Sequence, residues 1–278
     1  MGHTVTDLTP TTGVEISGLT GSRLVDPVVA AECLDALERR GVVIYREAHL
    51  DDDQLVAFSR LLGEVVPLPM GGDPRHPEIQ KITRDASQSK LAAYREGTFY
   101  WHIDGSTATV PDKATLLTAR QIADGDTGDT EFANTYAAYE ALPARGKAEL
   151  EGLRAVHSFT SAQLLVYPNP SPKERAAWDR NPAREHPLVW TRRSGRKSLL
   201  LGSTAGEVVG HTPAEGRALL DRLLEWATQP RFVLRHRWRV GDLVIWDNTG
   251  ILHRARPYSE QSARLMHRTS LAGEEAVA

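Results

Sequence analysis

Residues 232–253, FVLRHRWRVGDLVIWDNTGILH, hold the pattern that decides the fold. Polar and apolar side chains alternate over 232–240, which is the period of a strand with one buried face. The pair Gly241-Asp242 is a turn signal, and the apolar run 243–246 is typical of a buried strand. A final strand is expected over 264–271. Strands that follow one another through short turns favour an antiparallel sandwich or barrel.

Helices are expected on either side of these strands. One helix should span 27–40, because Asp26 can cap it and a proline occupies its first position. A buried strand is expected at 42–45, and a second helix after the acidic residues 51–53. A third begins at 212–215, where Thr, Pro and Glu form a capping box. The predicted fold class is therefore mixed α/β and mainly β.

Two long polar stretches interrupt these elements. Residues 67–97 are rich in Gly, Pro, Asp, Ser and Arg, only 79–82 resemble a strand, and a loop of this length is usually functional or disordered. We expect it to form a lid over the active site. The second stretch, 167–185, contains several prolines and precedes a hairpin pattern at 188–201. Neither stretch marks a sharp boundary, so we expect one domain over residues 1–278.

Composition and charge exclude several classes of protein. The chain has 33 Lys and Arg against 36 Asp and Glu, a formal net charge of −3, which gives no general attraction for nucleic acid or membranes. The single cysteine, Cys33, excludes an internal disulfide framework and a cysteine-rich zinc site. Without a signal-peptide pattern or a long apolar run, a cytoplasmic protein is expected. We expect a small-molecule substrate and a homo-oligomer, either a dimer or a tetramer.

Two His-x-Asp triplets are candidate metal sites. In the first, which ends at Asp51, the carboxylate is readily explained as a helix cap. The second, His102-Ile103-Asp104, follows three aromatic residues at 99–101 that favour extended backbone. Residues i and i+2 of a strand project from one face, so His102 and Asp104 could bind one ion. His253, directly after a buried strand, is the best candidate for a third ligand, which completes the His₂-carboxylate triad of non-haem iron oxygenases.

Arg264 and Arg268 lie four residues apart on the final predicted strand. They would share one face at a separation of roughly 13 Å. If this face is buried, both guanidiniums need anions, and if it is exposed, they are simply solvated. Periodicity alone leaves both possibilities open.

Taken together, these residues resemble the TauD/TfdA family of Fe(II)/2-oxoglutarate-dependent dioxygenases. The resemblance covers nearly the whole chain, in separate blocks that occur in the family's order. Besides the histidines and arginines, these blocks are 13–19, 41–46, 62–64, 125–130, 186–189, 195–197 and 246–248. The resemblance implies a double-stranded β-helix, which is a cupin-like jelly roll, with flanking helices.

The resemblance also implies roles for individual residues. His102, Asp104 and His253 match the iron ligands. Arg264 matches the arginine that pairs with the distal carboxylate of 2-oxoglutarate, and Thr130 matches a hydroxyl that joins that carboxylate. Arg268 matches a position that holds an anionic group of the substrate. Trp246 falls where the family has an aromatic residue near the iron.

The implied reaction oxidises a small organic acid with O₂. Decarboxylation of 2-oxoglutarate to succinate and CO₂ accompanies hydroxylation of the substrate, which leads to bond cleavage when the carbon carries oxygen or sulfur. The taurine-specific members have histidines and a tyrosine after the Gly63-Glu64 pair, and this chain has none there. A pocket with an apolar lining would favour a larger, more apolar body with an acid group. The expected lining is Val66, Leu68, Met70, Tyr100 and Trp101.

Two other classes of protein fit part of the pattern. A redox-inert zinc hydrolase can use the same two histidines and aspartate, but does not explain Arg264 together with Thr130. A non-catalytic jelly-roll binding protein would bury the histidines without a metal. The remaining histidines after His102 lack a partner at metal-ligand spacing and are expected to be packed or at the surface. They are His157, His186, His211, His236 and His267.

Overall fold

A computed structural model describes residues 2–67, 75–125 and 127–277. Its largest element is a seven-stranded sheet in the order β1-β2-β3-β13-β5-β15-β4. Neighbouring strands are antiparallel except β2 and β3, which are parallel. The strands are β1 (Thr4–Asp7), β2 (Val14–Ser17), β3 (Val42–Tyr45), β13 (Leu243–Asp247), β5 (Ala114–Gln121), β15 (Leu265–Leu271) and β4 (Gln80–Ile82).

A second antiparallel sheet packs on one face of the first. It has the order β12 (Val233–His236), β6 (Thr130–Asn134) and β14 (Ile251–Ala255). Alternate residues of the central strands explain the layers. Val244 and Trp246 of β13 join the cluster with Phe132 between the sheets, whereas Leu243 and Ile245 face the other side. The predicted sandwich is thus confirmed.

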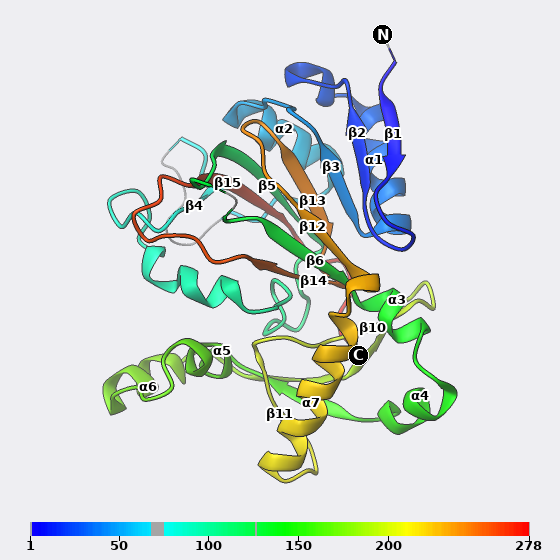
Figure 1. The fold of residues 1–278 in the computed structure, drawn as a ribbon, viewed down its shortest axis with the longest axis vertical. Helices are drawn as coiled ribbons and strands as arrows, with labels where there is room; N and C mark the ends of the chain where they lie inside the picture. Colours follow the sequence, from blue (N-terminus) through cyan, green and yellow to red (C-terminus); the bar gives the residue numbers. More distant parts are fainter. Residues whose placement is uncertain (1, 68–74, 126, 278) are drawn as a thin grey trace.

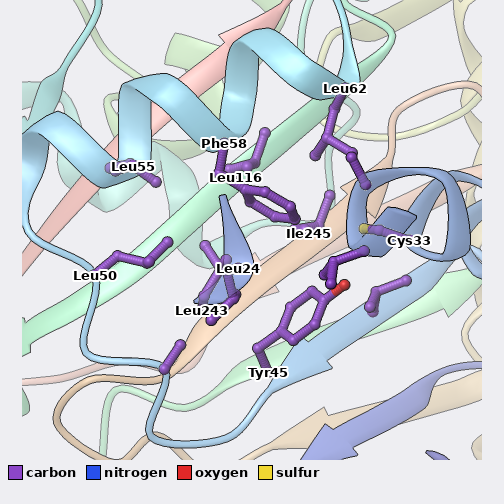
Figure 2. Close-up of a cluster of buried hydrophobic side chains, with 14 of the residues drawn as sticks. Leu24, Cys33, Tyr45, Leu50, Leu55, Phe58, Leu62, Leu116, Leu243 and Ile245 are labelled. Carbon is purple, nitrogen blue, oxygen red and sulfur yellow. The ribbon is translucent and has the colours of Figure 1, made fainter. Parts of the chain in front are cut away.

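Two helices cover the other face of the large sheet, and both had been predicted from their N-terminal caps. They are α1 (Pro27–Arg40), where Asp26 accepts from Val28 N at 2.7 Å, and α2 (Asp52–Leu62), which begins with a capping box at Asp51. Figure 2 shows Phe58 of α2 directed toward the sheet, with Tyr45 and Cys33 in the same apolar cluster. Burial raises the pKa of the Cys33 thiol to about 12, so Cys33 is a packed and unreactive cysteine.

A lower lobe continues from the second sheet (Figure 1). The predicted hairpin is present as β9 (Val189–Thr191) and β10 (Lys197–Leu199), and the predicted capping box begins α7 (Pro213–Ala227). The polar stretch 167–185 was not expected to form a helix, yet Ser171 caps α6 (Pro172–Trp178) within it. The other elements are α3 (Thr135–Glu140), α4 (Ala144–Leu150), β7 (Arg154–His157), α5 (Phe159–Val166), β8 (Arg184–Pro187) and β11 (Ala205–Val208), with 3-10 turns η1 (Gly21–Leu24), η2 (Ala92–Phe99) and η3 (Pro230–Phe232).

Two predictions about backbone conformation need correction. The alternating stretch 232–240 is a strand only over β12, because its partner β6 begins opposite His236 and offers no further backbone groups. In the stretch 67–97, the expected strand is present as β4, which pairs with β15, but most of η2 also lies there and was not expected. Residues 68–74 lie outside the described part. Among the described residues, no helix is long and apolar enough to cross a membrane.

Candidate metal centre and cosubstrate pocket

His102 and His253 face each other across a single β-bridge. Each backbone N–H donates to the carbonyl of the other residue, at 3.0 and 2.9 Å, and the ring centroids lie 4.1 Å apart. Asp104 lies in the turn that follows. One potential ligand atom from each of the three side chains lies within 4.8 Å of the other two. Within the described ranges, no other group of three such residues comes this close.

The route by which these side chains converge differs from the expected one. Phe99 is the last residue of η2, so 99–101 is not a strand, and only His102 forms a bridge. Asp104 is oriented by a side-chain relay that the sequence did not reveal. Thr115 of β5 donates to Asp104 Oδ2 at 2.8 Å, and Asn248 Nδ2 donates to Thr115 Oγ1 at 2.9 Å. The relay fixes a ligand that strand geometry does not position.

The donor atoms fit a divalent metal such as iron. The Nδ1 atom of His102 lies 2.8 Å from Tyr100 O and must donate to it, since a carbonyl only accepts. The lone pair of its Nε2 is therefore free to bind a metal. His253 Nε2 lies 3.5 Å from Asp104 Oδ2, and its Nδ1 is buried without a hydrogen-bond partner. Two imidazoles and one carboxylate are the ligand set of non-haem Fe(II) oxygenases.

Burial and charge set the protonation states that a metal needs. Burial lowers the pKa of both His102 and His253, for His253 well below its usual value, so both rings are neutral at pH 7. Burial alone would raise the pKa of Asp104, but Arg268 and the two histidines lower it well below its usual range. Neutral imidazoles and an ionised carboxylate are the forms that bind metal ions.

Arg264 is a buried cation next to this cluster. Its side chain is 3% exposed, and its Cζ lies 4.9 Å from the centroid of the Tyr258 ring. In the described part of the chain, no carboxylate forms an ion pair with it. Gly128 has φ +72°, and a Cβ there would lie 3.2 Å from Arg264 Cδ, so this glycine lets the preceding turn approach the arginine. A buried guanidinium without a counterion is a site for an anion.

Arg264 and Arg268 line one cavity together with Thr130, Trp246 and His253. This decides the question that periodicity left open, because both arginines face the interior. Arg264 itself precedes β15 by one residue, at a register shift between Leu265 and Met266. The Trp246 ring lies 4.6 Å from the ring of His253. The elements that the sequence predicted separately therefore meet in one pocket.

Arg268 has carboxylate neighbours, in contrast to Arg264. Its NH2 lies 3.2 Å from Asp104 Oδ2 and 3.9 Å from Asp112 Oδ2, and it donates to Ser270 Oγ at 3.1 Å. Arg268 thus links the candidate metal ligand Asp104 to the open part of the pocket.

Arg268 lines the pocket as expected of a substrate contact, but the expected apolar and aromatic lining lies elsewhere or outside the described ranges. Tyr100 is 39% exposed, and its hydroxyl donates to Leu165 O at 2.8 Å. Trp101 packs in the apolar cluster of the lower lobe. Leu68 and Met70 fall outside the described residues. The pocket is lined in addition by Ile82, Arg95, Thr98, Leu117 and Ala255, which the sequence analysis did not single out.

The other histidines have structural partners. His267 Nδ1 lies 2.7 Å from Asp52 Oδ1, and His157 Nδ1 lies 2.9 Å from Thr204 Oγ1. Asp51, from the first His-x-Asp triplet, caps α2 as expected. These positions agree with the assignment of the iron site to the second triplet.

Comparison with known proteins identifies the family. A model of the family described as "Taurine catabolism dioxygenase TauD, TfdA family" matches residues 4–270. The chain belongs to this family. The alpha-ketoglutarate-dependent 2,4-dichlorophenoxyacetate dioxygenase of Burkholderia sp. (strain RASC) is 35% identical over 274 residues, which cover 93% of this chain and 91% of that protein. The alpha-ketoglutarate-dependent sulfate ester dioxygenase of Pseudomonas putida is 30% identical, with coverage of 94% and 87%.

A solved structure agrees over the full length. The crystal structure of AAD-2 in complex with Mn(II) and N-oxalylglycine superposes with a TM-score of 0.82 at 32% identity and covers 100% of both chains. This TauD/TfdA protein is therefore an Fe(II)/2-oxoglutarate-dependent dioxygenase with the expected jelly-roll fold. The zinc hydrolase and the non-catalytic binding protein are the less well supported alternatives, since the relatives share the oxygenase activity.

Proposed function

We propose that this dioxygenase oxidises a small organic acid with an apolar body, with His102, Asp104 and His253 as the iron ligands. Hydroxylation of the substrate is coupled to decarboxylation of 2-oxoglutarate to succinate and CO₂. The observation that carries the proposal is the convergence of the three side chains beside Arg264, a buried cation without a carboxylate partner. When bound, iron and 2-oxoglutarate supply the oxidising chemistry.

The protein's own contribution is orientation. Arg264 can hold the distal carboxylate of 2-oxoglutarate through two parallel hydrogen bonds, which a planar guanidinium favours. Thr130 Oγ1 lines the same pocket and accepts from Trp238 Nε1 at 3.0 Å, which leaves its hydroxyl proton for the carboxylate. Thr115 and Tyr100 O keep Asp104 and His102 in their orientations.

An acidic substrate is supported by the relatives and by charge. The relatives named above act on a phenoxyacetate and on sulfate esters, and both kinds of compound combine an anionic group with an apolar part. Arg268 provides a second cation beside the candidate iron ligands. We therefore retain Arg268 as a substrate contact, with Ile82 and Leu117 as the apolar wall.

We also propose that the described part of 67–97, continued by Thr98, acts as a lid. The pocket has a volume of about 60 Å³, whereas small-molecule sites usually hold roughly 300–1,000 Å³. Arg95 and Thr98 of η2 form part of its wall, so movement of this segment would admit 2-oxoglutarate and substrate. The lid belongs to a single domain over 1–278.

Substrate-dependent succinate release tests the function. The protein is loaded with Fe(II) and 2-oxoglutarate without oxygen, and a panel of 2,4-dichlorophenoxyacetate, an alkyl sulfate ester and taurine is then added with O₂. The larger acids should stimulate succinate release more than taurine. Iron-loaded, folded protein that consumes no 2-oxoglutarate with any compound would contradict the proposal.

The assembly and location remain predictions. A homo-oligomer, dimer or tetramer, should give a corresponding mass in light scattering of the purified protein. A cytoplasmic location can be tested by fractionation of the source cells.

A further inference from the structure

Arg95 is a third arginine in the pocket. It belongs to η2 (Ala92–Phe99), its side chain is 6% exposed, and it lines the same cavity as Arg264 and Arg268. Its electrostatic neighbours include both of these arginines and Asp104. Arg95 is therefore buried beside the charged groups of this pocket, and it also lines a second cavity together with residues of α5 and α6.

The guanidinium of Arg95 forms no ion pair with the residues that the structure describes. Its Nε is buried without a hydrogen-bond partner, and its NH2 donates one long hydrogen bond to Lys81 O at 3.3 Å. Among the residues that the structure describes, no carboxylate forms an ion pair with it. Burying such a group costs free energy unless a ligand compensates, because a guanidinium in water is fully hydrogen-bonded.

Arg84, in the same segment, is an arginine whose guanidinium is held by structural contacts. Its NH2 forms ion pairs with Glu96 at 2.8 Å and Glu260 at 2.7 Å, and its NH1 donates to Tyr258 O at 3.0 Å. Its Cζ also lies 5.6 Å from the centroid of the Phe99 ring at the end of η2. Arg84 therefore holds the segment in place, whereas Arg95 has no comparable partner among the described residues.

The charges of the loaded pocket leave room for another anion. Burial lowers the pKa of Arg95 to about 10, with Arg268 and Arg264 acting in the same direction, so it is still a cation at neutral pH. The positive charges of Fe(II) and the three guanidiniums exceed the negative charges of 2-oxoglutarate, Asp104 and Asp112 by one. Arg268 already faces the last two carboxylates. The unmatched positive charge lies at Arg95.

We propose that Arg95 binds the anionic group of the primary substrate, together with Arg268, and makes the enzyme select charged acids over neutral compounds of the same shape. The inference rests on the proposed function, since it concerns the substrate of that site. A carboxylate or sulfate group has enough acceptor oxygens for both guanidiniums. Arg95 is thus a specificity residue contributed by the lid segment.

Matched ligands test the inference without turnover. The probes are 2,4-dichlorophenoxyacetate and 2,4-dichlorophenoxyacetamide, which have nearly the same shape but differ in charge. Their binding to protein loaded with Fe(II) and 2-oxoglutarate is measured by calorimetry without oxygen. The variants are Arg95→Met, Arg95→Lys and, as a control in the same segment, Arg84→Met.

The acid should bind the unaltered protein more tightly than the amide. Arg95→Met should weaken binding of the acid by about 10- to 100-fold, the usual effect of losing a charged hydrogen bond, and binding of the amide by less than about 3-fold. Arg95→Lys should recover part of the loss. Arg84→Met should affect both probes alike, because it loosens η2 and leaves the pocket charge.

Two results would overturn the inference. One is an equal loss for acid and amide in Arg95→Met, which would indicate a packing role. The other is unaltered protein with no preference for the acid, including protein that binds neither probe. Affinity for 2-oxoglutarate should stay unchanged in Arg95→Met, which also shows that the variant is folded. If the preference depends on Arg95 but no compound releases succinate, then the proposed reaction fails and the anion site stands.

Discussion

Two buried His–Asp pairs occur in the part of the chain that the structure describes, and they differ in what else surrounds the carboxylate. His236 Nε2 lies 3.2 Å from Asp242 Oδ2, and His253 Nε2 lies 3.5 Å from Asp104 Oδ2. All four residues are buried. Judged by distance and burial alone, the pairs are nearly equivalent.

The carboxylate of Asp242 accepts hydrogen bonds at both oxygens. Its Oδ1 accepts from the backbone N–H of Glu47 at 3.0 Å, and its Oδ2 accepts from Arg239 N at 2.9 Å and Arg46 NH1 at 2.7 Å. Both oxygens of this carboxylate therefore accept hydrogen bonds from the fold itself. This arrangement ties the turn before β13 to the end of β3.

The carboxylate of Asp104 is open on one side. Thr115, Arg268 and His253 all approach Oδ2, and no hydrogen bond or ion pair within the described chain reaches Oδ1. A second imidazole, His102, is directed to the same point. Unused acceptor capacity together with a second ligand, rather than the His–Asp pair, distinguishes a metal centre from a structural contact.

Removal of a candidate ligand should give the largest effect. We expect Asp104→Ala or His102→Ala to lower succinate release by more than about 100-fold, since loss of even an outer partner of a metal ligand costs about 10- to 100-fold. Bound iron, measured per folded protein, should fall in parallel. A variant with a tenth or more of the original turnover would show that the residue is not a ligand.

Replacement of Asp242 in the His236–Asp242 pair should lower stability rather than turnover. Asp242→Ala removes the acceptor for two backbone N–H groups and for one of the two ion pairs of Arg46, which keeps Glu15 at 2.6 Å. We expect a loss of about 3 kcal/mol in the free energy of unfolding, measured in urea. Turnover per folded molecule should change little. A large loss of iron without a loss of stability would invalidate the distinction between the pairs.

The sequence could predict features whose signals are local. Helix caps at Asp26, Asp51 and Thr212 depend on a few neighbouring residues, and all three were predicted. His102 and His253 were predicted from their relation to aromatic and apolar runs and from the family resemblance. The early end of β12 could not be predicted, because it depends on where the partner strand β6 begins.

Contacts across the fold left no local signal. Thr115 has the pattern of any buried strand residue, and only the register that sets it opposite Trp246 brings it near Asp104. Arg95 lies in a stretch that reads as a loop, where an arginine is ordinarily solvated. Which partner a side chain meets, and which it lacks, becomes visible only in three dimensions.

The same contrast applies to cations, and Arg264 tests it. Arg46 has two carboxylates, whereas Arg264 has none in the described structure. We expect Arg264→Lys to raise the KM for 2-oxoglutarate by about 10- to 100-fold, because an ammonium keeps the charge but loses the paired hydrogen bonds. The limiting turnover should fall less. An unchanged KM for 2-oxoglutarate would show that Arg264 does not bind the cosubstrate.

A third buried pair, His157 and His186, lacks a carboxylate altogether. The two rings lie 5.6 Å apart, and His157 is 0% exposed with no partner at Nε2. Burial, followed by the nearby His186, lowers the pKa of His157 to about 3. His157 is therefore neutral in the folded protein throughout the pH range in which the unfolded chain becomes protonated.

This pair predicts the smallest effect, a loss of stability in mild acid. In the unfolded chain, the pKa of this histidine is about 6.5, so below that pH the unfolded chain binds a proton that folded His157 does not bind. The free energy of unfolding therefore decreases as the pH is lowered, until about pH 3. From pH 7 to 5.5 the contribution of His157 is about 1 kcal/mol. His157→Gln should reduce the pH dependence measured in urea by this amount. An unchanged pH dependence in His157→Gln would show that the loss of stability in acid comes from other groups.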